Sequence, residues 1–152
     1  YAKRCVAIPG DSISIKDSRY RNSRAPDTGI PKENELRLRN TPDSLLLEAG
    51  VFQAGHFAAK QTEWTIKDFG PLLVPYSGLR LLMDDKTLPI YKDVIEFETG
   101  RTAAIWDGME YEFAQDYYFF AGDNVIDSKD SRYIGFVPLS FVIGIVNNVI
   151  AK

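Results

Sequence analysis

The sequence predicts a mainly β protein, because strand-forming residues are abundant and turn residues divide them into short stretches. Hydrophobic residues make up 45% of the 152 residues and charged residues 26%, so we expect a domain with a buried core, with or without an insertion. The eight tyrosines and nine phenylalanines suit a β-rich core. No run of about 18 apolar residues occurs, so no segment is predicted to span a membrane.

The N-terminal part is predicted to form two strands followed by a loop. Residues 2–8 have the composition of a strand, which ends at the Pro9-Gly10-Asp11 turn. Residues 12–15 alternate polar and apolar side chains, which predicts a returning strand. Residues 16–34 are polar and contain several turn-forming residues, so we expect a loop there.

Two helices are predicted in the middle of the chain. Thr41 as the N-cap, Pro42 at the first helical position and Gly50 beyond the end delimit the first helix. The second is expected between Pro89 and Gly100, where apolar residues recur at helical spacing: Ile90, Tyr91, Val94, Ile95 and Phe97.

The last third of the chain is predicted to return to strands. Residues 102–113 are typical of a hairpin around Asp107-Gly108. Residues 116–124 are typical of an aromatic strand that enters a polar loop. Residues 141–150 are apolar, and we expect them to form a final buried strand.

The pentapeptide KDSRY occurs twice, at residues 16–20 and at residues 129–133. The first copy lies in the predicted polar loop, and the second lies between two apolar strands. A duplicated unit should share its neighbouring residues, and the residues around these two copies differ. We therefore interpret the first copy as a coincidence and the second as the functional motif.

Composition excludes several classes of function. A net charge of −3 argues against binding of nucleic acid through its phosphates. The single cysteine, Cys5, excludes an internal disulfide, and with one histidine, His56, the chain cannot build a usual zinc site. We expect Cys5 to be a small buried residue, His56 to be structural or on the surface, and Asp84-Asp85 to be a solvated turn. No cofactor or metal is predicted.

Lys3 is the first candidate for chemistry. Alternation along the first strand puts Lys3, Cys5 and Ala7 on one face of the sheet, and Arg4, Val6 and Ile8 on the other. A lysine held among small side chains loses its charge more easily and can then act as a general base. A solvated lysine at a strand end has the same pattern, and periodicity alone favours that simpler interpretation.

The loop at residues 122–135 is the second candidate. It carries a dense group of polar side chains between two apolar strands: Asp123, Asn124, Asp127, Ser128, Asp130, Ser131 and Arg132. An extended backbone would put Asp130 and Arg132 on one face, where an ion pair can form. The loop either satisfies its own polar groups or lies beside Lys3 and orients it, and the residue pattern leaves both possibilities open.

Two separated motif blocks point to a family. The N-terminal block is KRCVAIPGD at residues 3–11, and the C-terminal block is GDNVIDSKDSRYIGFVP at residues 122–138. They are similar to the patterns K-R-x-x-G-x-P-G-D and G-D-N-x-x-x-S-x-D-S-R-Y-x-G-F-V-P, in the same order. The chain thereby resembles bacterial type I signal peptidases, which are membrane-bound serine proteases that use a Ser/Lys dyad.

The resemblance implies a role for each matched residue. Lys3 corresponds to the general base and Ser128 to a hydroxyl that orients the lysine. Two supporting ion pairs are implied, Asp130 with Arg132 and Arg4 with Asp123. The remaining residues of the implied site loop are Gly122, Asn124 and Ser131.

The sequence also departs from the family pattern. Ala7 stands where the family usually has Gly, and Val125 and Ile126 replace residues that are commonly polar. The family's nucleophilic serine lies in an S-x-M motif upstream of the lysine, and here only Tyr1 and Ala2 precede Lys3. We therefore expect the chain to be the C-terminal part of such a peptidase, without the serine and the transmembrane anchor, and inactive alone.

The resemblance implies an antiparallel β-sheet fold. Residues 1–15 and 111–152 would form part of the catalytic β core, and residues 16–110 an inserted, variable α+β region with few short helices. The implied function is removal of signal peptides from secreted precursors at the outer, periplasmic face of the cytoplasmic membrane. The substrate would lie extended along an exposed strand edge, and an edge left without its neighbour could pair with another copy.

Two other functions are compatible with parts of the sequence. One is a pseudoenzyme that lacks the serine and serves as a binding or regulatory module, although the retained Lys3, Ser128, Asp130 and Arg132 argue against it. The other is a related self-cleaving repressor-type peptidase domain. The G-F-V-P continuation of the C-terminal block and the missing DNA-binding segment argue against the second.

Overall fold

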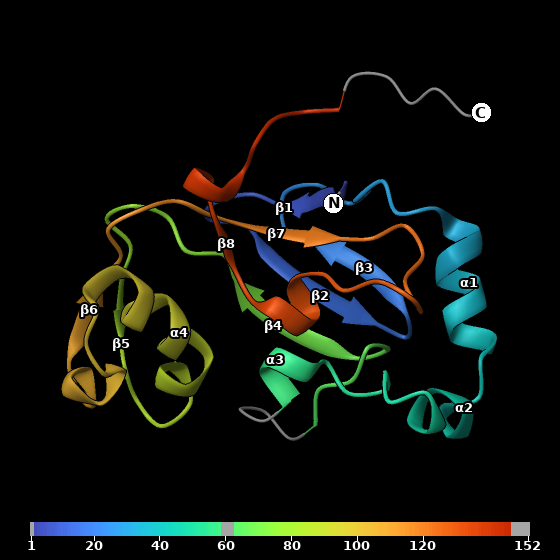
Figure 1. Cartoon of the computed structure of the whole chain (residues 1–152), viewed down its shortest axis with the longest axis horizontal. Coiled ribbons are helices and arrows are strands. Elements are labelled where there is room, and N and C mark those ends of the chain that lie inside the picture. Colours follow the sequence, from blue (N-terminus) through green and yellow to red (C-terminus); the bar gives the residue numbers. More distant parts are fainter. Residues whose placement is uncertain (1, 59–62, 147–152) are drawn as a thin grey trace.

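Three antiparallel sheets form the framework of a computed structural model that describes residues 2–58 and 63–146 (Figure 1). The first sheet has the order β1-β7-β8, with β1 at Arg4–Ala7, β7 at Tyr117–Ala121 and β8 at Val137–Pro138. The second has the order β3-β2-β4, with β2 at Ser12–Lys16, β3 at Arg19–Asn22 and β4 at Phe69–Leu73. The third pairs β5 (Arg80–Leu82) with β6 (Glu110–Glu112).

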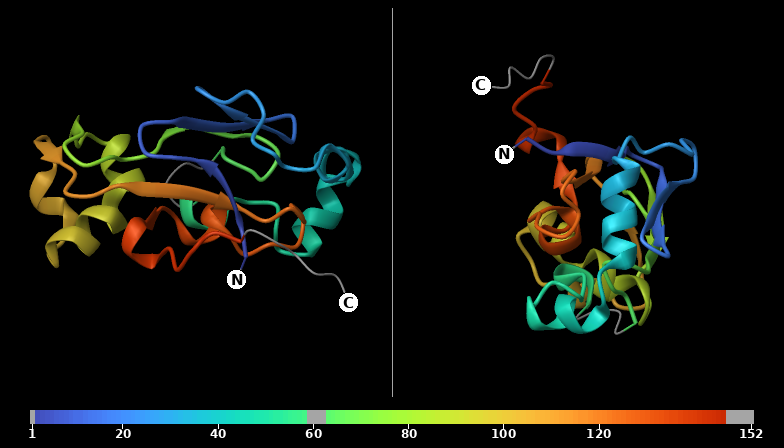
Figure 2. Two further views of the ribbon diagram at one scale, coloured as in Figure 1. Left: turned by 90° about the horizontal axis from the view of Figure 1, so that it is seen from above. Right: turned by 90° about the vertical axis from the view of Figure 1, so that its right-hand side faces the viewer.

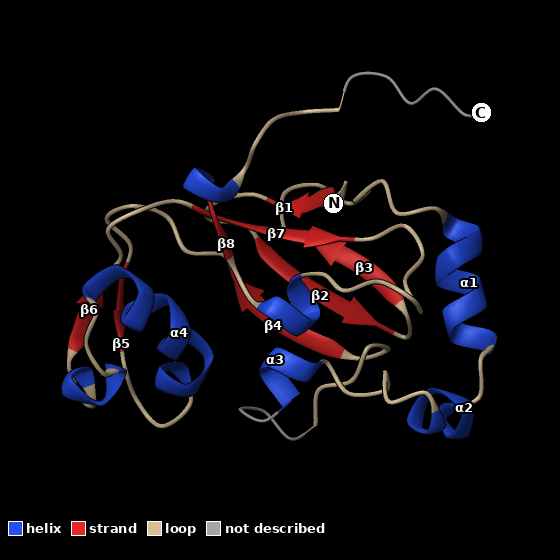
Figure 3. Cartoon of the chain, viewed as in Figure 1, coloured by secondary structure: helices blue, strands red, loops and turns tan. Residues whose placement is uncertain are grey.

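Short helices flank the sheets. Figure 3 shows α1 and α2 at one end of the molecule, and α4 at the other end beside β5 and β6. The helices are α1 (Lys32–Asn40), α2 (Asp43–Glu48), α3 (Gly55–Ala58), α4 (Thr87–Thr99) and α5 (Ser131–Ile134), with 3-10 turns η1 (Ala103–Trp106) and η2 (Leu139–Phe141). The mainly β, antiparallel fold with short helices is therefore confirmed.

Aromatic side chains fill the space between the first two sheets. Seen from above, β7 and the β2–β3 hairpin lie in two layers (Figure 2). Phe119 of β7 contacts Phe69 of β4, with ring centroids 5.7 Å apart, and Phe57 of α3 packs against Phe69 at 5.4 Å. All three rings are almost completely buried. Such aromatic contacts contribute roughly 0.5–1.5 kcal/mol each beyond the area they bury, so this cluster holds β7 firmly in place.

Strand β1 does not alternate as expected. Its register against β7 shifts between Cys5, which pairs with Phe120, and Ala7, which pairs with Phe119. This β-bulge turns both Val6 and Ala7 into the core and leaves Cys5 and Ile8 exposed. The prediction that Ala7 shares a face with Lys3 and Cys5 is therefore wrong. The expectation that Cys5 is buried is wrong as well.

Residues 16–34 are not the loop that was expected. The chain turns through Asp17 and Ser18, whose φ angles are +49° and +66°, and returns as β3. Positive φ at both central residues is the geometry of the tight hairpin turn that suits twisted strands. Sequence reasoning missed it because Asp-Ser is a weaker signal for this turn than Asn-Gly. The end of the expected loop also belongs to α1, which begins at Lys32.

The helix predicted after Thr41 is present as α2, but Thr41 does not cap its N-terminus. Thr41 follows the last residue of α1, and its Oγ1 donates to the carbonyl of Arg37 at 2.8 Å. Pro42 occupies the N-cap position of α2. Gly50 follows the helix with φ +70°, as a residue beyond a helix end often does. The predicted second helix is confirmed as α4, which ends at the left-handed Gly100.

The hairpin predicted at residues 102–113 is wrong. Residues Ala103–Trp106 form η1, and β6 pairs with β5, a strand about 30 residues earlier in the chain. Gly108 does make a turn with φ +72°, but its amide donates to the carbonyl of Met83 at 2.8 Å. A partner that is distant in sequence leaves no local signal, so the pattern was assigned to the nearest possible pairing.

The final strand predicted at residues 141–150 is absent over residues 141–146. Phe141 ends η2, and the following residues have no regular structure. Ile143 and Ile145 are exposed rather than buried, at 105% and 88%. Residues 147–150 lie outside the described residues. An apolar sequence therefore does not form a strand here without a neighbouring strand to pair with.

The division into a catalytic core and an inserted region stays a prediction. Strand β2, which starts within residues 1–15, forms its sheet with β3 and β4, and both of these strands come from residues 16–110. The sheets of the fold thus combine strands from both parts of the chain.

Candidate active site

The two motif blocks meet because β1 and β7 are antiparallel. Arg4, the first residue of β1, pairs with Ala121, the last residue of β7. Lys3 therefore precedes β1 at the point where Gly122 follows β7, and the start of β1 lies beside the end of β7 (Figure 1). Residues that are far apart in the sequence become neighbours at this corner of the first sheet.

Gly122 lies between Lys3 and Ser128. A Cβ atom at Gly122 would lie 3.4 Å from Lys3 Nζ and 2.6 Å from Ser128 Cβ, and closer still to Ser128 Oγ. Only glycine allows the Ser128 side chain to approach the backbone this closely. The half-buried amine of Lys3 and the hydroxyl of Ser128 are thus gathered around one Cα atom.

The Ser128 hydroxyl is a buried polar atom. Its Oγ makes no hydrogen bond of full geometry with the described residues, although it lies close enough to Asp130 to help lower the pKa of that carboxyl group. A buried hydroxyl without a full partner is costly and deserves a functional explanation. Asp130 and Lys3, two residues of the predicted site, both lie near this hydroxyl.

Asp130 and Arg132 form a completely buried ion pair. Arg132 Nε donates to Asp130 Oδ1 and Arg132 Nη2 to Asp130 Oδ2, both at 2.8 Å. Burial by itself would raise the pKa of Asp130, but hydrogen bonds and charge from Arg132 outweigh it and leave that pKa below its ordinary value. The bidentate geometry fixes both side chains.

This ion pair holds the loop that carries Ser128. Asp130 Oδ2 accepts from the amide of Gly122 at 2.9 Å, and Arg132 Nη1 donates to the carbonyl of Val125 at 2.8 Å. The hydroxyl of Ser131 accepts from the amide of Phe120 at 3.0 Å. The loop is therefore tied to both β7 and its own backbone, which leaves Ser128 little freedom to move away from Gly122.

A second ion pair joins the two motif blocks at the surface. Arg4 Nε and Nη2 each donate to the carboxylate of Asp123 at 2.9 Å. The hydrogen bond from Arg4 lowers the pKa of Asp123. Next to it, Asn124 Oδ1 accepts from Arg37 of α1 at 2.6 Å. Both implied ion pairs are thus present in the structure, and all predicted site residues lie at this corner.

The sequence analysis did not identify Tyr20, which lies near the buried Asp130–Arg132 ion pair of the site. It is buried on β3, and its charge interactions include those with Arg132, Asp130 and Glu35. Its hydroxyl has no hydrogen-bond partner among the described residues. The pattern Arg19-Tyr20-Arg21, with one apolar ring between two exposed cations, is the alternation that could have indicated a strand here.

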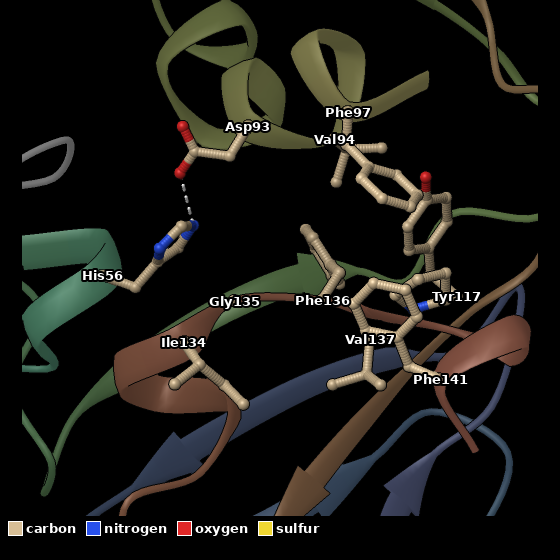
Figure 4. Close-up of a pocket in the computed structure, with 11 residues that line it drawn as sticks. His56, Asp93, Val94, Phe97, Tyr117, Ile134, Gly135, Phe136, Val137 and Phe141 are labelled. Atoms are coloured by element: carbon tan, nitrogen blue, oxygen red, sulfur yellow. Dashed lines mark ion pairs between the residues drawn. The ribbon is translucent and has the colours of Figure 1, made fainter. Parts of the chain in front are cut away.

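His56 lies in a separate pocket of about 290 Å³ where α3, α4 and η2 meet (Figure 4). Its Nε2 lies 3.2 Å from Asp93 Oδ2, and the ring packs edge-on against Phe57. The rest of the lining is mainly apolar, including Phe97 and Phe141, and contains none of the predicted site residues. The half-buried His56 therefore joins α3 to α4 and takes no part in the corner around Lys3.

Two further features concern residues 2–58 and 63–146, namely metal ligands and membrane-spanning helices. Within these ranges, no three side chains of His, Cys, Asp or Glu gather in a way that could hold a metal ion. No helix in the same ranges is both long and apolar enough to cross a bilayer.

Comparison with known families agrees with the two motif blocks. A family model described as signal peptidase, peptidase S26, matches residues 1–151. The match covers almost the entire chain, including the middle region between the two blocks. A search of curated proteins finds no match.

Proposed function

The chain belongs to the signal peptidase family S26, and from this we propose that it supplies the general base of a Ser/Lys peptidase that removes signal peptides from secreted precursors. The family consists of serine peptidases, so the chemistry is hydrolysis of a peptide bond. The observation that supports the finer proposal is the arrangement of Lys3 and Ser128 around Gly122.

In the proposed mechanism, Lys3 acts as a neutral amine. It takes the proton of a serine hydroxyl, whose oxygen attacks the carbonyl carbon of the scissile bond. The protonated Lys3 then gives its proton to the leaving amine, and water releases the acyl group by the reverse sequence. The Ser128 hydroxyl forms one hydrogen bond with the amine of Lys3 and so orients it. The Asp130–Arg132 pair keeps Ser128 in place.

The nucleophilic serine is proposed to come from residues outside these 152. Ser128 is the serine whose hydroxyl lies beside Lys3 among the described residues, and its position matches the orienting hydroxyl of the family pattern. The substrate would lie along β1, which is an edge strand in the order β1-β7-β8, and would add main-chain hydrogen bonds to it. We place the site at the outer face of the cytoplasmic membrane, where precursors emerge.

Substitution of Lys3 in the full-length protein tests the proposal. Lys3→Ala should lower the rate of cleavage of a secreted precursor by about a hundredfold to ten-thousandfold, the usual contribution of a general base. Ser128→Ala should cause a smaller loss. Lys92→Ala is the control, because this exposed lysine lies on α4, away from the site. Unchanged cleavage by Lys3→Ala would overturn the proposal and favour a binding or regulatory role.

A second experiment tests the origin of the nucleophile. The 152-residue chain, incubated with a synthetic peptide that spans a signal-peptide cleavage site, should give no product. If the chain cleaves the peptide and Ser128→Ala abolishes that cleavage, then Ser128 itself is the nucleophile. The assignment of an outside serine would then be wrong.

A further inference from the structure

A groove of about 940 Å³ lies between β3 and α1, and its lining contains none of the residues predicted for the site. Its lining contains four basic and two acidic side chains, the latter being Asp27 and Glu35, together with apolar ones. The basic ones are Arg19, Arg21, Lys32 and Arg39, and the apolar ones include Pro26, Ile30 and Leu36. A volume near the upper end of the range for ligand sites, about 300–1,000 Å³, makes the groove large enough for a substantial ligand.

The local geometry explains why the cations converge on one groove. Arg19 and Arg21 are two residues apart on β3 with the buried Tyr20 between them, so both point outward on one face. On α1, Lys32 and Leu36 are four residues apart, and Arg39 follows three residues later, so all three share one face of the helix. Residues of both faces line the groove.

Three of these cations have no partner among the described residues. Most basic side chains in residues 2–58 and 63–146 make an ion pair or a hydrogen bond, as Arg39 does with Asp17. Those without one in these ranges are Arg19, Arg21, Lys32, Arg101 and Lys129. Three of the five line this groove, although a net negative chain offers many carboxylates with which they could pair.

The charge of the surrounding segment differs from that of the chain. Residues 16–40 contain seven Lys or Arg and four Asp or Glu, whereas the whole chain has a net charge of −3. The groove is therefore a positive site on a protein that is otherwise negative. An anionic partner would be attracted here and repelled elsewhere.

We propose that this groove binds the headgroup region of an anionic phospholipid at a bilayer surface. Guanidinium groups bind phosphate through two parallel hydrogen bonds, and Arg19 and Arg21 present two of them side by side. The half-exposed Leu36 and the neighbouring Pro26 offer an apolar surface to the glycerol and the upper acyl chain. The combination of cations and apolar side chains matches an amphiphile better than a purely ionic ligand.

The hydrogen bonds of β3 argue against an added peptide strand. Glu35 of α1 reaches across and accepts from the amide of Tyr20 at 2.9 Å. This outward backbone donor, which an incoming strand would need, is already occupied. The lipid contact would act in addition to any membrane-spanning segment, and it does not depend on the proposed peptidase activity.

Vesicle binding tests this proposal. The 152-residue chain is sedimented with vesicles of phosphatidylcholine alone, or of phosphatidylcholine with one third phosphatidylglycerol, at low and high salt. Binding should occur with the anionic vesicles only and should weaken as salt rises. The variant with Arg19→Gln and Arg21→Gln should bind about thirtyfold less tightly, because each basic residue near an anionic surface contributes about fivefold. Leu36→Ser should weaken binding as well.

The matched control removes the same charge elsewhere. Arg101→Gln with Lys129→Gln takes away two exposed cations that also have no partner in residues 2–58 and 63–146, but neither lines the groove. This variant should keep nearly full binding. Equal losses in the two double variants would overturn the proposal, because they would show a diffuse effect of net charge. Absence of binding to anionic vesicles, with or without binding of a polyglutamate peptide, would also overturn it.

Discussion

Tyr20 and Arg132 lie close enough in the core for each to shift the pKa of the other. They are also the fifth and fourth residues of the two KDSRY copies, at residues 16–20 and 129–133. The first copy forms the end of β2, the tight turn and the start of β3, whereas the second caps and forms α5. The same five residues thus fold in two ways, and tertiary contacts rather than local preference decide between them.

Removing the Tyr20 hydroxyl should cost little stability. Tyr20→Phe deletes a buried hydroxyl that has no hydrogen-bond partner among the described residues, so the free energy of unfolding should change by less than about 0.5 kcal/mol or rise. Tyr117→Phe is the matched variant, because Tyr117 is equally buried but donates to Glu98 at 3.0 Å. It should cost about 1.5–3 kcal/mol in urea unfolding. Equal losses would contradict this expectation.

The two ion pairs of the site should differ sharply in their contribution to stability. Asp130→Asn leaves the guanidinium of Arg132 buried without its counter-charge, which should lower the free energy of unfolding by about 3–5 kcal/mol. Asp123→Asn breaks the half-exposed pair with Arg4 and should cost at most about 1 kcal/mol. Urea unfolding of both variants measures the difference. Losses of similar size would show that Arg132 finds another partner.

Stability should fall in acid because the pKa of Asp130 is lowered in the folded state. At pH values between the folded-state pKa of Asp130 and its ordinary pKa of 3.8, the unfolded chain binds one more proton than the folded chain. The free energy of unfolding therefore rises with pH in this range. The contribution of the ionised Asp130 to stability is complete above the ordinary pKa and is lost as the pH falls through the folded-state pKa. The urea midpoint should therefore be steady near neutral pH and drop below about pH 4. The difference between the wild type and Asp130→Asn should shrink over the same range, and a constant difference would contradict the assignment.

A methyl group at Gly122 should disturb the site. Gly122→Ala places its Cβ against Ser128, so Ser128 and Lys3 must move apart, and overpacking of this kind costs about 1–3 kcal/mol. Gly144→Ala is the control, because a Cβ there meets no atom within 4 Å, and its effect should stay within about 0.5 kcal/mol. In the full-length protein, Gly122→Ala should also lower the rate of precursor cleavage, and by a larger factor than the loss of folded protein explains. Cleavage at the wild-type rate would show that the spacing around Gly122 is not critical.

The sequence predicted those parts of the fold that have local signals. Strand β7 and helix α4 were predicted because a run of aromatic residues and the helical spacing of apolar residues are strong local signals. The corner around Lys3 and Ser128 was found through the resemblance of two motif blocks, not through periodicity. Residue patterns alone favoured a solvated lysine over a general base at position 3.

Features that depend on distant or unusual backbone geometry were missed. The turn at Asp17 and Ser18 needs positive φ at two residues other than glycine, which sequence rules treat as rare. The bulge at Cys5 interrupts the alternation that the prediction relied on. Strand β6 pairs with β5 across a helix, and Tyr20 reaches Arg132 from the opposite end of the chain. None of these contacts can be deduced from a window of neighbouring residues.

The pairing of Arg4 with Asp123 has a consequence for the time at which the site comes into being. These residues are 119 positions apart, so the N-terminal block is synthesised long before its counterpart leaves the ribosome. Lys3 has none of its neighbours in the site until almost the whole chain has been translated and β7 has paired with β1. The corner around Lys3 therefore forms only when the fold is nearly complete, and a hairpin or helix that forms early does not assemble it.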